Sequence, residues 1–184
     1  SPASCEASIH SDTSDCNDAL ERQFIQRGAS MVIPPEVMGS HIGPPRAHTT
    51  GRRHSLAFRG VTALFGHLGV EWDITAADDG NLEQLAHIIA IHKRHRDLLH
   101  HGDTVRFDAV DAGNLAHGVY ARDRSEALVA LVQVGTAASL VPPHLRLPDL
   151  DPDRRYTVRP VSLEPDRDDL GPRALGPAAR QPEW

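Results

Sequence analysis

The sequence is poor in aromatic residues and cysteine and lacks long apolar runs. Aromatic side chains make up 4% of the 184 residues, so the core must be built mainly from aliphatic side chains. Cys5 and Cys16 are the only cysteines, and two cysteines cannot form a disulfide framework. The longest apolar stretches, such as Ala127–Val132, fall well short of the roughly 20 residues of a membrane-spanning helix. We therefore expect neither a disulfide scaffold nor a membrane partner.

The chain also lacks an excess of positive charge. Its 19 Lys and Arg residues face 25 Asp and Glu residues, which gives a net charge of −6. Nucleic-acid binding needs a basic stripe, so we expect no nucleic-acid partner. Hydrophobic residues make up 40% of the chain, which is typical of a folded domain. No signal peptide opens the chain, and we expect a cytoplasmic location.

The first hundred residues show a mostly helical pattern. Helices are predicted over Ala19–Arg27, with Leu20 and Phe24 one turn apart, over His54–His67, and from Leu82 to about Leu99. The apolar run Ser30–Ile33 predicts a buried strand. Glu36–Arg53, rich in glycine, proline and histidine, is predicted to be a long loop.

The pattern then changes from the helical period to the alternation of strands. Gly102 ends the last helix, which predicts a boundary between two structural units there. The predicted antiparallel strands are Thr104–Phe107, Gly118–Ala121, Glu126–Val134, Leu145–Leu147 and Tyr156–Val161. From Leu163 onward the apolar pattern ends, and we predict a disordered tail.

Two carboxylates three residues apart, Asp15 and Asp18, precede the first helix. One interpretation is structural: Asp15 is the N-cap and Asp18 stands at the third helical position, as in a capping box. The other is catalytic: Asp15 lies where a barrel strand passes into a helix, which is the rim that carries catalytic acids in β/α barrels. The spacing alone leaves both open.

The residues around this pair resemble a known enzyme family. The segment Thr13–Gln23 resembles the acid/base segment of α-galactosidases of glycoside hydrolase family 36, in which an S-D-x-x-D-A motif leads into a helix. Further blocks resemble the family in the same order. They are Pro34–Gly43, Arg46–Arg52, Leu56–Arg59, Ala63–Gly66, Glu71–Asp73 and Lys93–Leu99.

The resemblance implies an α/β fold followed by a β fold. Residues 1–102 would be the C-terminal strands and helices of a (β/α)8 barrel, residues 103–162 a small antiparallel β-sandwich domain, and residues 163–184 the disordered tail. It also implies a retaining hydrolase of terminal α-galactosides, with no cofactor and no metal. An α-galactoside oligosaccharide is the implied partner, and a homo-oligomer is allowed.

The resemblance further implies roles for three residues. Asp15 would be the general acid and base, Asp18 a substrate-binding or supporting group, and Cys5 the counterpart of a family cysteine that precedes a galactose-binding loop. The family's stacking tryptophan is replaced by Asp12. Its nucleophile lies on a barrel strand earlier than the Asp15 strand. We therefore expect this chain by itself to be inactive.

Two alternatives from other classes remain. The chain could be a non-catalytic remnant that keeps only a structural role. Its 12 histidines also raise the possibility of a metal-binding protein, with His92, His95, His100 and His101 as candidates. However, His92 and His95 lack the glutamate of an H-E-x-x-H motif, so histidines at a solvated or half-buried helix surface are the favoured interpretation.

Overall fold

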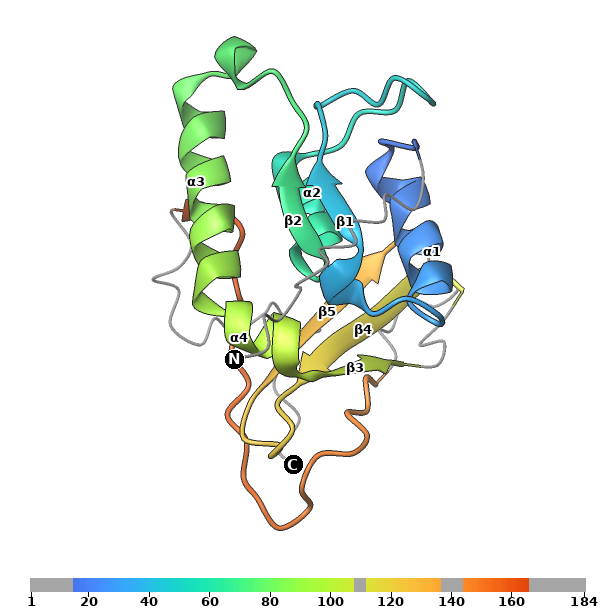
Figure 1. The fold of residues 1–184 in the computed structure, drawn as a ribbon, viewed down its shortest axis with the longest axis vertical. Helices are drawn as coiled ribbons and strands as arrows, with labels where there is room; N and C mark the ends of the chain where they lie inside the picture. The colour runs from blue at the N-terminus through green and yellow to red at the C-terminus, as the bar shows by residue number, and fades with distance from the viewer. Residues whose placement is uncertain (1–14, 108–111, 137–143, 166–184) are drawn as a thin grey trace, which may run out of the picture.

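The computed structural model describes residues 15–107, 112–136 and 144–165. These residues form a mixed α/β segment followed by an antiparallel sheet (Figure 1). The helices are α1 (Ala19–Ala29), α2 (Leu56–Leu64), α3 (Asp79–Arg94) and α4 (Arg96–His101), with the short 3-10 helices η1 (Pro35–Val37) and η2 (Ile74–Ala76). The strands are β1 (Gly39–Ile42), β2 (His67–Val70), β3 (Asp103–Arg106), β4 (Asn114–Tyr120) and β5 (Ala127–Gln133).

The two strands of the α/β segment, β1 and β2, are parallel and connected through α2. Gly39 pairs with His67 and Ile42 with Val70, so the carboxyl ends of both strands lie at the same edge. Helix α2 packs against both strands and also contacts α1 and α3. Ile42 and Ile88 are completely buried in this core, where α2 and α3 meet. The arrangement is a β-α-β unit of the kind that builds parallel sheets.

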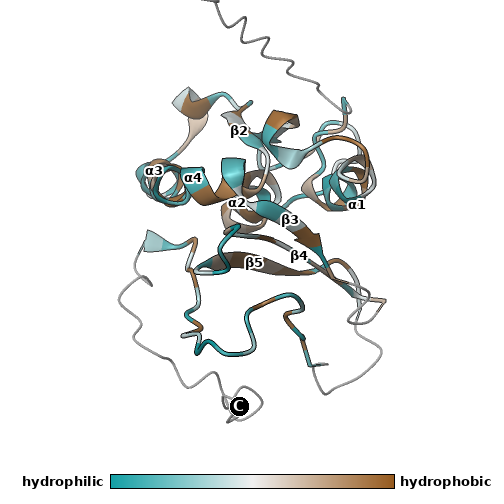
Figure 2. Cartoon of the chain, turned by 60° about the horizontal axis from the view of Figure 1, so that its bottom comes forward, coloured by the Kyte–Doolittle hydropathy of each residue, from teal (hydrophilic) through white to brown (hydrophobic). Residues whose placement is uncertain are grey.

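The antiparallel sheet has the order β3-β4-β5, and its face lies against the helices (Figure 2). One hydrophobic cluster joins Leu64 of α2, Ile91 of α3 and Leu99 of α4 to apolar side chains of β4 and β5. The fold class predicted from the sequence is therefore confirmed: a parallel α/β segment followed by a small antiparallel sheet. The unit boundary near Gly102 stays a prediction, because this cluster contains residues from both sides of it.

The predicted strand Ser30–Ile33 is wrong. These residues form the turn after α1, and Met31 and Val32 are 71% and 84% exposed. The strands actually lie in segments that were expected to be irregular or helical. Strand β1 falls inside the predicted loop Glu36–Arg53, and β2 occupies the end of the predicted helix His54–His67 and the residues after it.

The later elements agree in part with the expectations. The predicted helix from Leu82 to Leu99 is divided at His95 into α3 and α4, and the strands β3, β4 and β5 fall close to their predicted places. Leu145–Leu147 and Tyr156–Val161 are not strands. Leu163 lies in the predicted disordered tail, but it packs against two hydrophobic clusters: the one that joins the helices to β4 and β5, and the one between β1, α2 and α3. The tail from residue 166 on lies outside the described residues.

No helix among the described residues is long and apolar enough to cross a membrane.

Candidate functional site

The segment before α1 lies at the carboxyl end of β1. Gly43 directly follows this strand, and a Cβ atom built on Gly43 would lie 3.5 Å from the carbonyl oxygen of Asn17. Asp15 stands two residues before Asn17 and is exposed. In α/β folds the carboxyl ends of parallel strands are where functional side chains gather. Asp15 thus lies close to the edge of the sheet at which such a site is expected.

Asp18, not Asp15, is the N-cap of α1. Its Oδ1 atom accepts hydrogen bonds from the backbone N–H groups of Leu20 (2.8 Å) and Glu21 (3.4 Å). The capping-box interpretation, with Asp15 as the cap and Asp18 inside the helix, is therefore wrong. The physical reason is that the extended backbone of Asp18 turns its carboxylate onto the first free N–H groups of the helix.

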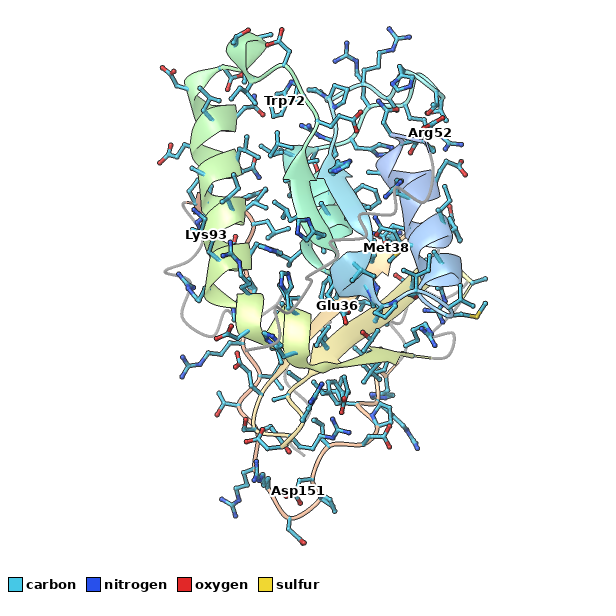
Figure 3. All side chains as sticks on the ribbon, viewed as in Figure 1. Glu36, Met38, Arg52, Trp72, Lys93 and Asp151 are labelled. Atoms are coloured by element: carbon cyan, nitrogen blue, oxygen red, sulfur yellow. The ribbon has the colours of Figure 1, made fainter. Side chains whose placement is uncertain are left out.

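The Asp18 carboxylate also binds the loop that follows β1. Its Oδ1 contacts His54 Nε2 at 2.9 Å, and its Oδ2 accepts hydrogen bonds from Arg52 Nη1 at 3.1 Å and from the Thr50 hydroxyl. The side chain is fully buried. Arg52 in turn donates to Glu21 at 2.6 Å and lies at the same end of the molecule as Trp72 (Figure 3). Asp18 thereby joins the start of α1 to residues more than 30 positions away.

These contacts determine the charge of Asp18. Burial raises the pKa of its carboxyl, but hydrogen bonds from Thr50, Leu20, His54 and Glu21 outweigh that effect and lower the pKa to about 2. Asp18 is thus ionised at neutral pH and cannot act as a proton donor. Because both oxygens are occupied by protein donors, substrate binding by Asp18 stays a prediction without support from this geometry.

Cys16 and Asn17, which lie between the two acids, contact the same loop. The Asn17 amide bonds to the His48 ring and backbone, and Cys16 Sγ lies 3.8 Å from the Thr49 hydroxyl. Gly51, with a φ of +75°, lets the loop turn back so that Arg46 and Arg53 pair across it. Cys5 and Asp12, the other residues considered in the sequence, lie outside the described residues.

A buried arginine joins the ends of the two parallel strands. Arg59 of α2 donates to the carbonyl oxygen of Gly43 at 2.5 Å, and its guanidinium lies 4.9 Å from the ring centroid of Trp72. It is 4% exposed, and burial lowers its pKa to about 10. Sequence reasoning missed Thr50, Arg52, His54 and Arg59. The only available signal for Thr50, Arg52 and Arg59 was their place in the blocks that resemble the family, and His54 lies outside these blocks.

The histidines do not form a metal site among the described residues, in which no three potential ligands are grouped suitably. His92 is buried, and its Nδ1 atom lies 3.2 Å from the Leu64 carbonyl oxygen. The His100 ring stacks with the His67 ring and meets the His92 ring edge-on. Burial lowers the pKa of His92 and His100, so these rings are neutral at pH 7 and serve as packing groups.

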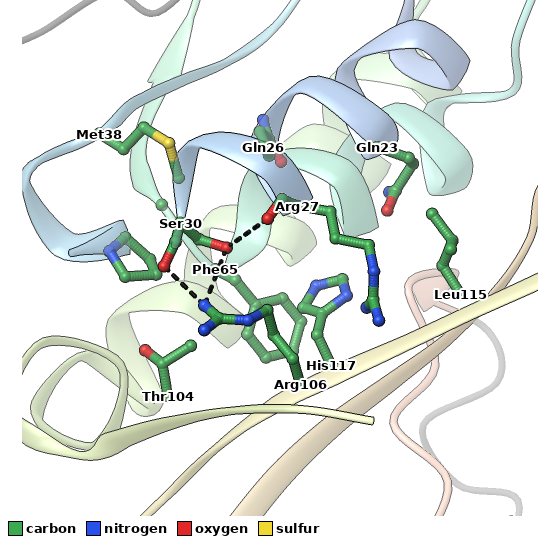
Figure 4. A pocket seen from close by; sticks show the side chains of 12 residues that line it. Gln23, Gln26, Arg27, Ser30, Met38, Phe65, Thr104, Arg106, Leu115 and His117 are labelled. Carbon is green, nitrogen blue, oxygen red and sulfur yellow. Dashed lines mark hydrogen bonds between the residues drawn. The ribbon is translucent and has the colours of Figure 1, made fainter. Parts of the chain in front are cut away.

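A cavity lies at the other end of α1, between η1 and the sheet (Figure 4). Arg27 spans it to the carbonyl oxygens of Phe107 (2.8 Å) and Ala116 (3.2 Å), while Arg106 donates to the carbonyl oxygen of Ser30 at 2.6 Å. Its volume is about 40 Å³, which has room for a water molecule or two but not for a sugar. The candidate site is the edge formed by Asp15–Asp18 and the loop after β1, because functional side chains gather at the carboxyl ends of parallel strands.

Comparison with known proteins gives two family matches. Residues 6–102 match the family described as Melibiase, and residues 114–178 match the glycosyl hydrolase family 36 C-terminal domain. An α-galactosidase of Escherichia coli is 45% identical over 148 residues, which cover 80% of this chain and 21% of that protein.

Solved structures agree with these matches. The α-galactosidase AgaA of Geobacillus stearothermophilus is 36% identical, with a TM-score of 0.70 over 75% of this chain and 19% of AgaA. A variant of AgaA in complex with raffinose is 35% identical, with a TM-score of 0.69 over 73% of this chain and 19% of that chain. The chain thus spans about a fifth of the length of the relatives it matches.

Proposed function

The chain belongs to the family-36 glycoside hydrolases, the melibiase family of α-galactosidases, and on this premise we propose that it carries the general acid/base, Asp15, of a retaining α-galactosidase. The observation that carries the proposal is the different environment of the two acids. Asp18 is buried and saturated with protein donors, whereas Asp15 is exposed at the edge where parallel strands end.

The chemistry follows from the retaining mechanism. Asp15 first protonates the departing glycosidic oxygen while a second carboxylate attacks the anomeric carbon, and it then removes a proton from the water that releases the sugar. The two carboxylates stand about 5–5.5 Å apart in such enzymes. By resemblance, the second carboxylate belongs to a barrel strand that precedes the Asp15 strand. This chain supplies the proton-transfer half of the site.

The proposed substrates are oligosaccharides with a terminal α-galactosyl residue. Variants of the similar enzyme AgaA have been crystallised with raffinose and with stachyose. The AgaA chains in these two complexes match 73% and 75% of this chain. No cofactor is needed, because two carboxylates and water suffice for the reaction.

The chain by itself is expected to be inactive, since one general acid contributes only about 10²–10⁴-fold to the rate. The test is a chimera of the E. coli relative in which this chain replaces the matching 148-residue segment. The chimera should hydrolyse p-nitrophenyl α-galactoside and raffinose, while the isolated chain should hydrolyse neither.

Variants of the chimera test the role of Asp15. Asp15→Asn should slow the hydrolysis of raffinose strongly. It should slow the glycosylation step with p-nitrophenyl α-galactoside much less, because the nitrophenolate leaving group needs little protonation. Added azide should restore turnover of the nitrophenyl substrate by the variant. The matched control is Asp79→Asn, at an exposed position in α3, which should change neither the hydrolysis of raffinose nor that of the nitrophenyl substrate. A folded chimera without activity would favour the alternative, a non-catalytic remnant. Equal losses for both substrates without azide rescue would remove Asp15 from the acid/base role.

A further inference from the structure

The side chain of Asn17 is held in one orientation by the loop after β1. Its Oδ1 atom accepts hydrogen bonds from the His48 backbone N–H at 3.1 Å and from the Thr49 hydroxyl at 3.4 Å. A backbone N–H can only donate, so the atom it reaches must be the amide oxygen. The amide nitrogen of Asn17 therefore points at the His48 ring.

This orientation determines the role of the His48 ring in the contact. The Asn17 Nδ2 atom lies 2.6 Å from His48 Nδ1. An amide nitrogen is a donor without an acceptor lone pair, so Nδ1 has to accept the hydrogen bond. The contact thus requires a neutral imidazole with its proton on Nε2. A protonated ring would place two N–H groups against each other.

We propose that His48 is a positioning residue for Asp15, which holds the Asp15–Asn17 segment firmly against the loop while its ring is neutral and less firmly when the ring is protonated, because the ring contact with Asn17 is then lost. The inference rests on the proposed role of Asp15 as the acid/base. Asp15 is exposed and lies two residues before Asn17, so the contacts of Asn17, together with the Cys16–Thr49 contact, tie the segment next to Asp15 to the loop.

Asp18 does not share this pH dependence. The pKa of its carboxyl is lowered to about 2, so α1 keeps its cap in either state of the His48 ring. The two elements that His48 joins carry several other charged or titratable groups. These are Asp15, Asp18 and Glu21 at the start of α1, and Arg46, Arg52, Arg53 and His54 in the loop.

The decisive variant exchanges the donor on Asn17 for an acceptor. In Asn17→Asp, a carboxylate oxygen faces Nδ1 and accepts a hydrogen bond from the protonated ring. The wild-type segment is expected to be ordered at pH 7.5 and mobile at pH 5, whereas the Asn17→Asp segment should become more ordered at pH 5. A contact that does not depend on the protonation of the His48 ring would not reverse its pH dependence.

The readout in the isolated chain is NMR. Backbone ¹⁵N order parameters of Cys16 and Asn17 report the order of the segment, and the ring ¹⁵N shifts of His48 report which nitrogen is protonated. His48→Phe should lower the order parameters at both pH values, while the control His144→Phe, at an exposed and distant position, should leave them unchanged. The proposal would be overturned if His48→Phe left the order parameters unchanged, or if the order of the Asn17→Asp segment depended on pH in the same direction as in the wild type.

The chimera then separates this inference from the function it rests on. His48→Phe should reduce kcat for raffinose about tenfold with little change in KM, because a misplaced general acid affects the chemical step. An inactive chimera combined with the expected NMR result would refute the proposed function alone. An active chimera with an unchanged kcat in His48→Phe would refute the positioning role alone.

Discussion

Asp18 offers the sharpest test of how the candidate site is built. Replacing Asp18 with Asn keeps an oxygen that can cap α1, since Asn and Asp are nearly equivalent at this position. The change removes the negative charge and turns an NH₂ group towards the Arg52 guanidinium and the Thr50 hydroxyl. The variant therefore probes the connection between helix and loop and leaves the helix cap in place.

The expected magnitude follows from the pKa of the carboxyl group. A shift from 3.8 to about 2 corresponds to about 2 kcal/mol of folding free energy at neutral pH. The folded-state pKa is the lower one, so this stabilisation is present above pH 3.8 and is lost as the pH falls through about 2. We expect Asp18→Asn to lose about 2–3 kcal/mol at pH 7, and the gap to wild type to narrow by about 1 kcal/mol at pH 3.

Urea unfolding followed by circular dichroism at both pH values measures the difference. The matched control is Asp78→Asn, because Asp78 caps α3 through Asn81 at an exposed position without a partner loop. Its cost should stay within about 0.5 kcal/mol. Equal costs for both variants, or a gap for Asp18→Asn that does not change with pH, would refute the reasoning.

Other parts of the structure predict further outcomes, each measurable as an unfolding free energy. Gly28→Ala should stabilise α1 by about 0.5–1 kcal/mol, because a Cβ atom at this position meets nothing within 4 Å. Gly102→Ala should instead cost more than about 2 kcal/mol, because its Cβ atom would lie 2.6 Å from two carbonyl oxygens. Leu163→Ala should cost about 1–2 kcal/mol, since this side chain packs against two hydrophobic clusters. Val158→Ala should cost almost nothing, because Val158 is 70% exposed. Burial, and to a smaller extent the charge of Arg27, lower the pKa of His117 to about 4. Because the unfolded chain then binds a proton more readily than the folded one, the free energy of unfolding should be highest above pH 6.5 and should decline towards pH 4. His117→Phe should make that decline shallower; an unchanged slope would contradict the assignment.

The helices α1 and α3 and the antiparallel strands could be predicted because each carries its own periodic signal. Strands β1 and β2 could not. They are only four residues long, and each contains a glycine, Gly39 or Gly69, which weakens the strand signal. Their pairing with each other and their packing on α2 decide their conformation, and a Cβ on Gly69 would collide with the His41 ring. Conversely, Met31 and Val32 are apolar but find no neighbouring layer to cover them, so the apolar run does not become a strand.

The sequence by itself determined the family, the pair of acids and the change from helix to antiparallel strand, since these depend on motifs and on periodicity within short segments. Only the tertiary structure decided which acid caps the helix. Asp18 became the buried cap because Thr50, Arg52 and His54 reach it from more than 30 residues away, and Asp15 remained exposed. Burial and hydrogen bonding set the charge and accessibility of a carboxyl group, and both depend on segments that meet only when the chain is folded.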